Sequence, residues 1–440
     1  MSVFEGAGQR LWGDAKRIIP GGNQLLSKRS EMFLPNLWPA YYSRASGYTV
    51  WDLDNRQFSD LATMGIGACA LGYADPDVNS AVKRAVDLGS MSTLNCKEEV
   101  ELAARLIRLH PWADMARFSR SGGEACSIAV RIARAATKRS KVLFCGYHGW
   151  HDWYLAANLE DPTNLDQQLL SGLSAVGVGS HMTGSAVPFK YNDLPMLETL
   201  LEKNKGDVAA IMMEPVRGTV PDDGFLKGVR ELANRHGAVL IFDEVTSGFR
   251  INNGGVHMFY EVYPDIAVFG KALGNGYPIS AVIGCEHVMQ AAQSSFISST
   301  FWTERVGFTA ALATLEKIEA TRAWEHLIFC GERVNAAWQS AADLSGIKIS
   351  VSGIAPLTHI DFICDEPAVQ QTLYTQEMLR RGYLAGSSVY TSYAYDEDLL
   401  SSLHSVFLDV FGVVKSSTEN PDQITALLSD VKHSGFQRLT

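Results

Sequence analysis

The sequence predicts an α/β protein with a mostly parallel β-sheet in a large domain and a second, smaller α+β domain. Between residues 115 and 271, short apolar runs alternate with amphipathic helical patterns, as in a parallel sheet with right-handed crossovers. The runs are rich in Val, Ile and Leu and too short for ordinary helices, so we expect strands buried on both faces. After about residue 320 this regular alternation ends, and helices are mixed with strands whose apolar residues alternate. Three parts are therefore expected: an N-terminal segment packing on the small domain (1–60), the large domain (61–320) and the C-terminal small domain (321–440).

Composition narrows the class of protein. Of the 440 residues 46% are hydrophobic and 20% charged, which is typical of a globular enzyme and unlike a disordered chain. The net charge of −10, without a basic run, argues against nucleic acid or an anionic membrane surface as the main partner. Seven scattered cysteines include no C-x-x-C pair and no zinc spacing, and the N-terminus mixes charged with apolar residues. We therefore expect a cytoplasmic protein without a signal peptide.

The N-terminal third predicts an arm and then the start of the large domain. Residues 4–18 have helical spacing that ends at Pro20-Gly21-Gly22, and residues 47–52 alternate like a strand. The glycines of Met64-Gly65-Ile66-Gly67 do not open a helix after a long strand, so we interpret them as a loop rather than a dinucleotide-binding motif. Two helices are expected next, over residues 75–89 and 97–110.

A glycine pair begins the clearest amphipathic helix of the chain. After a short strand through Phe118, the sequence reads Ser121-Gly122-Gly123-Glu124, and apolar residues follow at 125, 128, 129, 132, 133 and 136. Ser121 and Glu124 form a capping box. The open backbone N–H groups and the helix dipole favour an anion there, so this turn is either a phosphate cup or a plain helix cap.

The next strand, residues 141–147, delivers Tyr147-His148-Gly149-Trp150-His151. These side chains fit metal ligands, core packing or a ring stacked on a flat cofactor. Without a carboxylate or cysteine at ligand spacing, the metal interpretation is disfavoured. Residues 208–213 predict another strand that ends at Glu214, and residues 224–235 a helix that stops at Gly237.

The central strands each end in one charged residue. Ala238 to Phe242 ends at Asp243, and Ile266 to Phe269 delivers Lys271. In an open parallel sheet ligands sit outside the carboxyl ends of the strands, so Asp243 and Lys271 are expected to face one site. They form a structural ion pair, simply cap two strands, or make a site for pyridoxal phosphate. The aldehyde of pyridoxal phosphate condenses with a lysine amine, and a carboxylate holds its ring nitrogen protonated. The predicted elements that follow are a strand at 281–285, a hydroxyl-rich loop at 294–304, a helix to about 320, strands at 347–351 and 358–364, a helix at 367–381 and a helical tail.

Six motifs in this order carry a family resemblance. They are Ser121-Gly122-Gly123-Glu124-Ala125, Tyr147-His148-Gly149, Glu214-Pro215, Asp243-Glu244-Val245, Gly270-Lys271 and Ser299-Thr300. Together they resemble class III (fold-type I) pyridoxal-phosphate aminotransferases, in particular the glutamate-1-semialdehyde 2,1-aminomutase branch. The resemblance implies a seven-stranded, mostly parallel sheet, pyridoxal 5'-phosphate as cofactor, a homodimer, and small-molecule amino donors and carbonyl acceptors.

The resemblance also implies roles for single residues. Lys271 would be the Schiff-base lysine and Asp243 the partner of the pyridine nitrogen. Tyr147 and Val245 would cover the two faces of the ring, with His148 beside Tyr147. Ser121, Gly122 and Gly123 would hold the phosphate. Glu214 would lie near the ring hydroxyl, and Thr300 would reach the phosphate of the neighbouring subunit. Lys271, Asp243 and Tyr147 would be catalytic. The implied reaction is amino transfer through a pyridoxamine phosphate intermediate, with no metal.

Departures from the family pattern bear on the substrate. The family usually has Thr where this chain has Gly123, and Gly-Asn-Pro where it reads Trp302-Thr303-Glu304. The aminomutase has an Arg where this chain reads Ser27-Lys28-Arg29 and a Glu near Tyr390. These changes favour transfer to a bulkier or less acidic carbonyl compound. The alternative is glutamate-1-semialdehyde 2,1-aminomutase; a racemase or decarboxylase is a further one. A non-catalytic relative would be expected to lack Lys271, and a nicotinamide-dependent dehydrogenase would need a fingerprint that the sequence does not contain.

Overall fold

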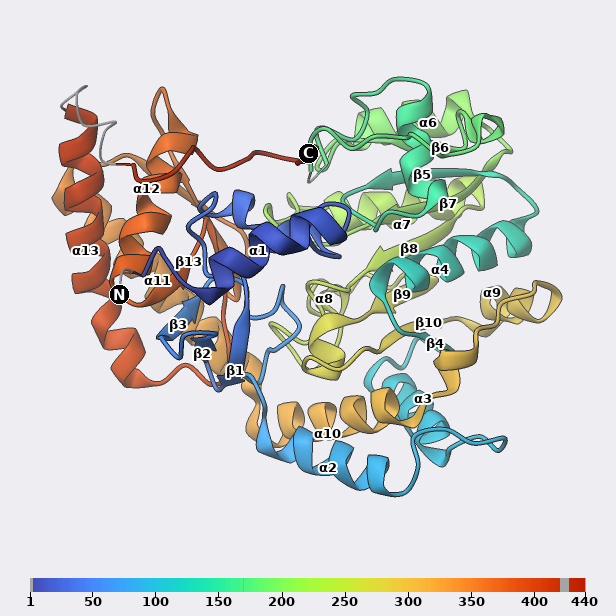
Figure 1. The fold of residues 1–440 in the computed structure, drawn as a ribbon. Helices are drawn as coiled ribbons and strands as arrows, with labels where there is room; N and C mark the ends of the chain where they lie inside the picture. The colour runs from blue at the N-terminus through green and yellow to red at the C-terminus, as the bar shows by residue number, and fades with distance from the viewer. Residues whose placement is uncertain (1–2, 169, 420–426, 440) are drawn as a thin grey trace. The chain divides into compact units, whose positions relative to one another are not determined.

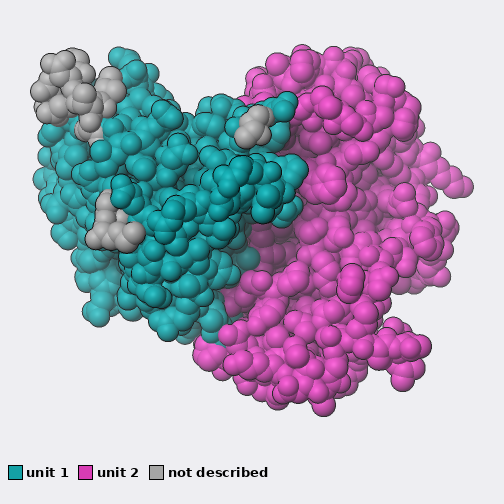
Figure 2. Space-filling view, in the orientation of Figure 1, with its two compact units in different colours: residues 1–75, 326–440 teal, residues 76–325 magenta. Residues whose placement is uncertain are grey.

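The computed structural model describes residues 3–168, 170–419 and 427–439, which form two compact units. Unit 2 is residues 76–325; unit 1 combines residues 1–75 with residues 326–440, apart from those not described (Figure 2). Residues 61–75 lie in unit 1 because Leu61 and Met64 are buried in its core and strand β3 (Gln57–Leu61) pairs with β13 (Tyr383–Ala385). The N-terminal segment therefore shares a core with the C-terminal part of the chain.

Unit 2 is built on a seven-stranded sheet in the order β4-β10-β9-β8-β7-β5-β6 (Figure 1). Strands β9, β8, β7, β5 and β6 are parallel, and β10 is antiparallel to both of its neighbours. The expected mostly parallel sheet is thus confirmed. Its strands are β4 (Met115–Ser119), β5 (Lys141–Cys145), β6 (Ala186–Pro188), β7 (Val208–Met213), β8 (Val239–Asp243), β9 (Ile266–Phe269) and β10 (Ser280–Gly284).

Helices cover both faces of this sheet. Alternate residues of the same strands fall into two separate clusters: Val142 and Phe144 pack with α4 (Gly122–Thr137), whereas Leu143 packs with α6 (Leu194–Lys203) and α7 (Phe225–His236). This two-sided burial is the reason that the strands are apolar throughout. The other helices of unit 2 are α2 (Pro76–Asp87), α3 (Lys97–Leu109), α5 (Asp152–Leu155), α8 (Val256–Phe259), α9 (Glu286–Met289) and α10 (Arg305–Thr321).

Unit 1 contains two smaller sheets and four helices among its described residues. The sheets have the orders β1-β2-β3-β13 and β11-β12-β14. The strands not yet given are β1 (Tyr42–Ser46), β2 (Thr49–Asp52), β11 (Ile349–Ser352), β12 (Leu357–Phe362) and β14 (Ser388–Tyr390). The helices are α1 (Ala7–Ile18), α11 (Ala323–Ser345), which begins at the end of unit 2, α12 (Pro367–Arg380) and α13 (Glu397–Glu419).

Helix α13 is long and apolar enough to cross a membrane by length and composition. Its buried residues, however, recur at helical spacing and belong to the core of unit 1, beside Trp338 and Tyr374: Leu399, Leu400, Leu403, Phe407, Val410, Phe411 and Val414. One face of the helix is therefore a packing face of a folded unit, which explains its apolar composition.

A buried polar network lies next to the end of β8. His257 Nε2 accepts a hydrogen bond from Trp112 Nε1 at 2.9 Å, so His257 Nδ1 carries the proton and donates to Glu244 Oε1 at 2.8 Å. Ser247 Oγ donates to the other oxygen of Glu244 at 2.6 Å. Both His257 and Glu244 are completely buried, so their polar atoms depend on this network for hydrogen bonds.

Replacing His257 with leucine is expected to lower the free energy of unfolding by about 3 kcal/mol, because it leaves the Glu244 carboxylate buried without its ring donor. The measurement is urea unfolding followed by circular dichroism. His287→Leu is the matched control, since His287 is exposed on α9, and it should change stability by less than about 0.5 kcal/mol. Equal effects of the two variants would contradict the assigned role of the network.

Candidate active site

Asp243 and Lys271 arrive at the same edge of the sheet. Strands β8 and β9 are parallel neighbours, with Asp243 paired opposite Val268, and Lys271 follows two residues after the end of β9. The prediction that these neighbouring strands deliver both residues to one edge is therefore confirmed. Lys271 has a left-handed backbone (φ 45°), as does Asn275 four residues later (φ 43°), so the chain turns sharply as it leaves the strand.

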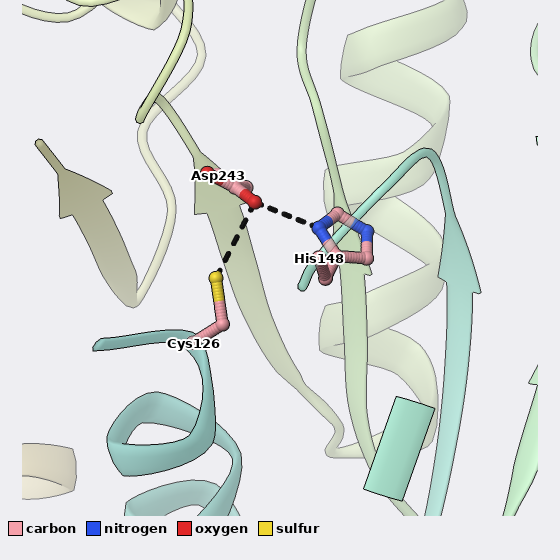
Figure 3. A group of neighbouring side chains, drawn as sticks. All are labelled: Cys126, His148 and Asp243. Atoms are coloured by element: carbon pink, nitrogen blue, oxygen red, sulfur yellow. Dashed lines mark hydrogen bonds and ion pairs between the residues drawn. The ribbon is translucent and has the colours of Figure 1, made fainter. Parts of the chain in front are cut away.

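The Asp243 carboxylate is buried and surrounded by hydrogen-bond donors. His148 Nδ1 lies 2.8 Å from Oδ2, and the Cys126 thiol donates to the same oxygen at 3.4 Å (Figure 3). The Val245 N–H donates to Oδ1 at 3.0 Å. Burial by itself raises the pKa of Asp243, but the hydrogen bond and charge of His148, with the Val245 N–H, bring that pKa below its ordinary value. The side chain is therefore held as an anion in an apolar setting.

His148 joins Asp243 to the end of β5. Its second ring nitrogen, Nε2, lies 3.1 Å from the carbonyl oxygen of Cys145, and the ring stacks on Trp153. Both ring nitrogens therefore face oxygen atoms, which fixes the orientation of the ring beside the Asp243 carboxylate.

Cys126, His148 and Asp243 also offer three metal-type ligand atoms within 4.8 Å of one another. The sequence places these residues far apart, so their spacing gave no sign of this cluster. Two features favour a hydrogen-bonded group over a metal centre. Nδ1 and Oδ2 are in direct hydrogen-bond contact, and burial together with the charge of Asp243 raises the pKa of the Cys126 thiol well above its ordinary value, whereas metals bind the thiolate.

The Lys271 amine donates to the Thr246 hydroxyl at 2.8 Å, while Asp243 takes its hydrogen bonds from His148, Cys126 and Val245. This arrangement differs from a structural ion pair between Asp243 and Lys271. Burial, followed by the positive charge of Arg217, lowers the pKa of Lys271 to about 8, against the opposing charge of Glu214. Roughly a tenth of Lys271 is therefore the free amine at pH 7, far more than for an ordinary lysine, and this is the nucleophilic form.

The lowered pKa predicts how the reactivity of Lys271 depends on pH. The rate at which Lys271 condenses with an added aldehyde should rise with pH with a midpoint near 8, because only the unprotonated amine attacks. Arg217→Gln should move the midpoint up, since it removes a repelling charge, and Glu214→Gln should move it down, since it removes an attracting one. Stopped-flow absorbance measures both shifts. Movement of the two midpoints in the same direction would contradict this assignment.

Glycines bring three segments together at the start of α4. The expected capping box is present: the Glu124 N–H donates to Ser121 Oγ at 3.4 Å, and the Ser121 N–H donates to Glu124 Oε2 at 2.9 Å. A Cβ at Gly122 would lie 2.9 Å from a Val245 methyl, and one at Gly149 would lie 2.9 Å from the Cα of Gly123. Only glycines allow this approach, so a cradle of open backbone forms at the helix N-terminus. The cradle fits an anionic group such as a phosphate.

Tyr147 and Glu214 lie next to this cradle at the ends of β5 and β7. Glu214 Oε2 accepts from the Tyr147 N–H at 3.1 Å, and Arg217 Nη1 lies 3.0 and 3.1 Å from the two oxygens of Glu214. A Cβ at Gly146 would come within 2.8 Å of Glu214 Oε2, so the glycine admits this carboxylate. Burial raises the pKa of Tyr147, so its phenol stays neutral and its ring offers an uncharged face.

Thr300 is exposed and begins a short helical turn, residues Thr300–Thr303. The departures that follow it have structural roles: Trp302 Nε1 donates to Glu124 Oε1 at 3.3 Å, and the Glu304 side chain caps α10 through the N–H groups of Val306 and Gly307. The turn is thereby fixed to the start of α4.

Two further departures, at Ser27-Lys28-Arg29 and Tyr390, lie in unit 1. Arg29 Nη1 donates to the carbonyl oxygen of Gln437 at 3.0 Å, and its guanidinium lies over the ring of Phe436. Tyr390 ends β14 and is partly buried, with its N–H bonded to the carbonyl oxygen of Ala62. Arg29 therefore anchors the C-terminal segment of the chain.

The sequence pointed to Asp243, Lys271, His148 and the glycine turn, but several partners were missed. Thr246 at the Lys271 amine, Cys126 at Asp243, and Arg217 at Glu214 contact the predicted residues directly. Arg217 lies three residues after Glu214, a spacing that could have indicated a pair. Cys126 lies one helical turn after Gly122 and is buried, but nothing in its spacing indicates contact with Asp243.

Known proteins share this architecture. Residues 35–366 match the family Aminotransferase class-III. The chain is 32% identical to 3-aminobutyryl-CoA aminotransferase of Cloacimonas acidaminovorans over 86% of each chain, and 32% identical to glutamate-1-semialdehyde 2,1-aminomutase of Desulforamulus reducens over 88% of this chain and 87% of that protein. The structure of the PLP internal aldimine form of the Sphingopyxis sp. MTA144 FumI protein matches with a TM-score of 0.86 at 26% identity, covering 95% of this chain and all of that one. The chain therefore belongs to the class III aminotransferases, whose cofactor is pyridoxal phosphate.

Proposed function

We propose that the chain moves an amino group between an amino donor and an aldehyde or ketone acceptor, with Lys271 as the covalent attachment point of pyridoxal phosphate and Asp243 as the partner of its ring nitrogen. The observation that carries this proposal is the pair of groups at the ends of β8 and β9: a buried carboxylate kept anionic, and an amine whose pKa is lowered to about 8. We assign the cofactor to unit 2, which holds both.

When bound, pyridoxal phosphate supplies an aldehyde for an amine and a protonated ring that withdraws electrons from the substrate carbon. Asp243 would keep that ring nitrogen protonated, because an anion held by His148 favours a cation beside it. Lys271, once free, would take a proton from the substrate carbon and return it elsewhere as a general base and then acid; a pKa near neutrality suits both directions. Thr246 would orient the amine.

The remaining assignments concern binding. The Ser121, Gly122 and Gly123 turn would hold the phosphate by backbone N–H groups at the helix N-terminus, and Tyr147 and Val245 would cover the two faces of the ring. Glu214, paired with Arg217, would lie near the ring hydroxyl. The seven cysteines are free thiols, which suits a reducing cytoplasm.

We further propose a homodimer in which Thr300 reaches the phosphate of the neighbouring site. Around this turn Phe296 is 86% exposed and Phe301 is 67% exposed, which is unusual for aromatic side chains that stay in water. Light scattering of the purified protein should give twice the chain mass. A monomer at micromolar concentration would contradict this assignment of Thr300.

The proposed reaction is tested by substrate-dependent conversion of the bound cofactor. An amino donor such as 3-aminobutyryl-CoA, the substrate named for one relative, is mixed with the holoenzyme, and the absorbance change to pyridoxamine phosphate and the released carbonyl product are measured. Transfer to a separate acceptor supports an aminotransferase. Quantitative conversion of glutamate-1-semialdehyde to 5-aminolevulinate, without release of a carbonyl product, would instead support the aminomutase.

A further inference from the structure

The glycine at position 123 leaves a space that another side chain fills. A Cβ at Gly123 would lie 3.0 Å from both Nδ1 and Cε1 of His151, which is closer than real Cβ contacts normally come. The edge of the His151 ring thus lies directly against the place where a side chain at 123 would begin. With a threonine at 123, the His151 ring would have to shift from its present position.

His151 is held in this place by its own segment. Its carbonyl oxygen accepts from the N–H groups of Tyr154 and Leu155, so the residue caps α5, and its ring stacks on Trp150 with centroids 4.6 Å apart. Gly149, with φ 99°, makes the turn that returns the chain to α4. The ring is therefore positioned against the glycine cradle by local structure.

The ring nitrogen on that edge is in an unusual state. His151 Nδ1 is buried and has no hydrogen-bond partner among the described residues. An unpaired buried polar atom is costly and calls for an explanation. Burial also lowers the pKa of His151, against the charges of Glu124 and Asp152, so the ring is neutral at pH 7 and has one N–H to donate.

We propose that His151 supplies the side-chain hydrogen bond to the cofactor phosphate that a threonine at position 123 would otherwise make. The donor comes from the loop after β5 instead of from α4, and it meets the same anion that the backbone of Gly122 and Gly123 faces. This inference rests on the proposed function, because it needs pyridoxal phosphate in the glycine cradle. It makes His151 a positioning residue for the cofactor and gives the unpaired nitrogen a partner.

The test compares pyridoxal phosphate with pyridoxal, which lacks the phosphate. Dissociation constants of both from the apoenzyme are measured by quenching of tryptophan fluorescence. His151→Phe keeps a ring but has no hydrogen-bond donor. It should raise the dissociation constant of pyridoxal phosphate at least about 10-fold, while the dissociation constant of pyridoxal changes less than about twofold. His151→Asn, which keeps a polar atom near Nδ1, should stay within about threefold of the wild type for both.

A double variant supplies the rescue. Gly123→Thr with His151→Ala moves the donor back to α4 and should recover most of the affinity for pyridoxal phosphate that His151→Ala loses, because the hydroxyl then has the space that the ring vacates. If His151→Phe lowers the affinity for both compounds equally, or for neither, the inference is wrong. Circular dichroism of each apoenzyme confirms that the fold is retained, and His151→Ala, which also lacks the donor, allows the same comparison if the phenylalanine variant does not fold.

The failure of this inference is distinguishable from failure of the proposed function. A wild-type protein that carries the cofactor on Lys271, but whose preference for pyridoxal phosphate over pyridoxal is unchanged in His151→Phe, overturns only the role of His151. A wild-type protein that binds no pyridoxal phosphate overturns both.

Discussion

Replacing Lys271 with alanine is expected to lower the rate of amino transfer at least about 10⁴-fold, the largest effect of any single substitution. The variant removes both the amine that attaches the cofactor and the base placed to move the substrate proton. The Lys271 amine donates a hydrogen bond to the Thr246 hydroxyl, and its lowered pKa makes it reactive near neutral pH. The measurement is the single-turnover rate with a saturating amino donor.

Two controls separate chemistry from folding. Lys271→Arg keeps a positive charge but has no nucleophilic amine, so it should be almost as inactive as the alanine variant. Lys227→Ala removes an exposed lysine of α7 in the same unit and should retain wild-type activity within about twofold. A Lys271→Ala protein that keeps more than a hundredth of the wild-type rate would show that another residue moves the proton.

Asp243→Asn is expected to reduce the rate about 10³-fold while leaving the fold intact. Asparagine has nearly the same shape but no charge, so it loses the anion that would hold the ring nitrogen protonated, and it leaves the buried His148 ring facing a neutral amide. The substrate carbon would then lose its proton much more slowly. The rate of substrate-proton exchange, measured by NMR, reports this step.

Cys126→Ala is the matched comparison for Asp243. It removes a neutral hydrogen-bond donor from the Asp243 carboxylate, while His148 and the Val245 N–H remain. The rate of amino transfer should therefore fall less than about tenfold. Asp243→Glu keeps the charge but moves it by one methylene, and its activity should lie between the two. Equal losses in Asp243→Asn and Cys126→Ala would mean that charge is not what matters at position 243.

The sequence was sufficient for the parts of the fold that depend on local pattern. The buried runs that end at Asp243 and before Lys271 predicted neighbouring parallel strands, and the structure confirms them because residues covered by helices on both faces are apolar without interruption. The Ser121 and Glu124 capping box is likewise a short-range feature that spacing alone identifies.

The features of the site that the sequence did not predict depend on contacts between segments that are far apart in the chain. Cys126 and His148 meet at Asp243 from α4 and the end of β5, and no spacing in the chain encodes that meeting. The same is true of His151. The sequence places it in an aromatic cluster, but only the fold brings its ring within 3.0 Å of where a Cβ at Gly123 would lie. Sequence reasoning thus located the charged groups at the strand ends but not the neighbours that set their protonation.

The most direct test is to reduce the purified holoenzyme with borohydride, digest it, and locate the pyridoxyl group by mass spectrometry. We expect one stoichiometric label on Lys271, and no label in the Lys271→Ala protein. A label on a different lysine, or no label in a protein that still transfers amino groups, would contradict this expectation.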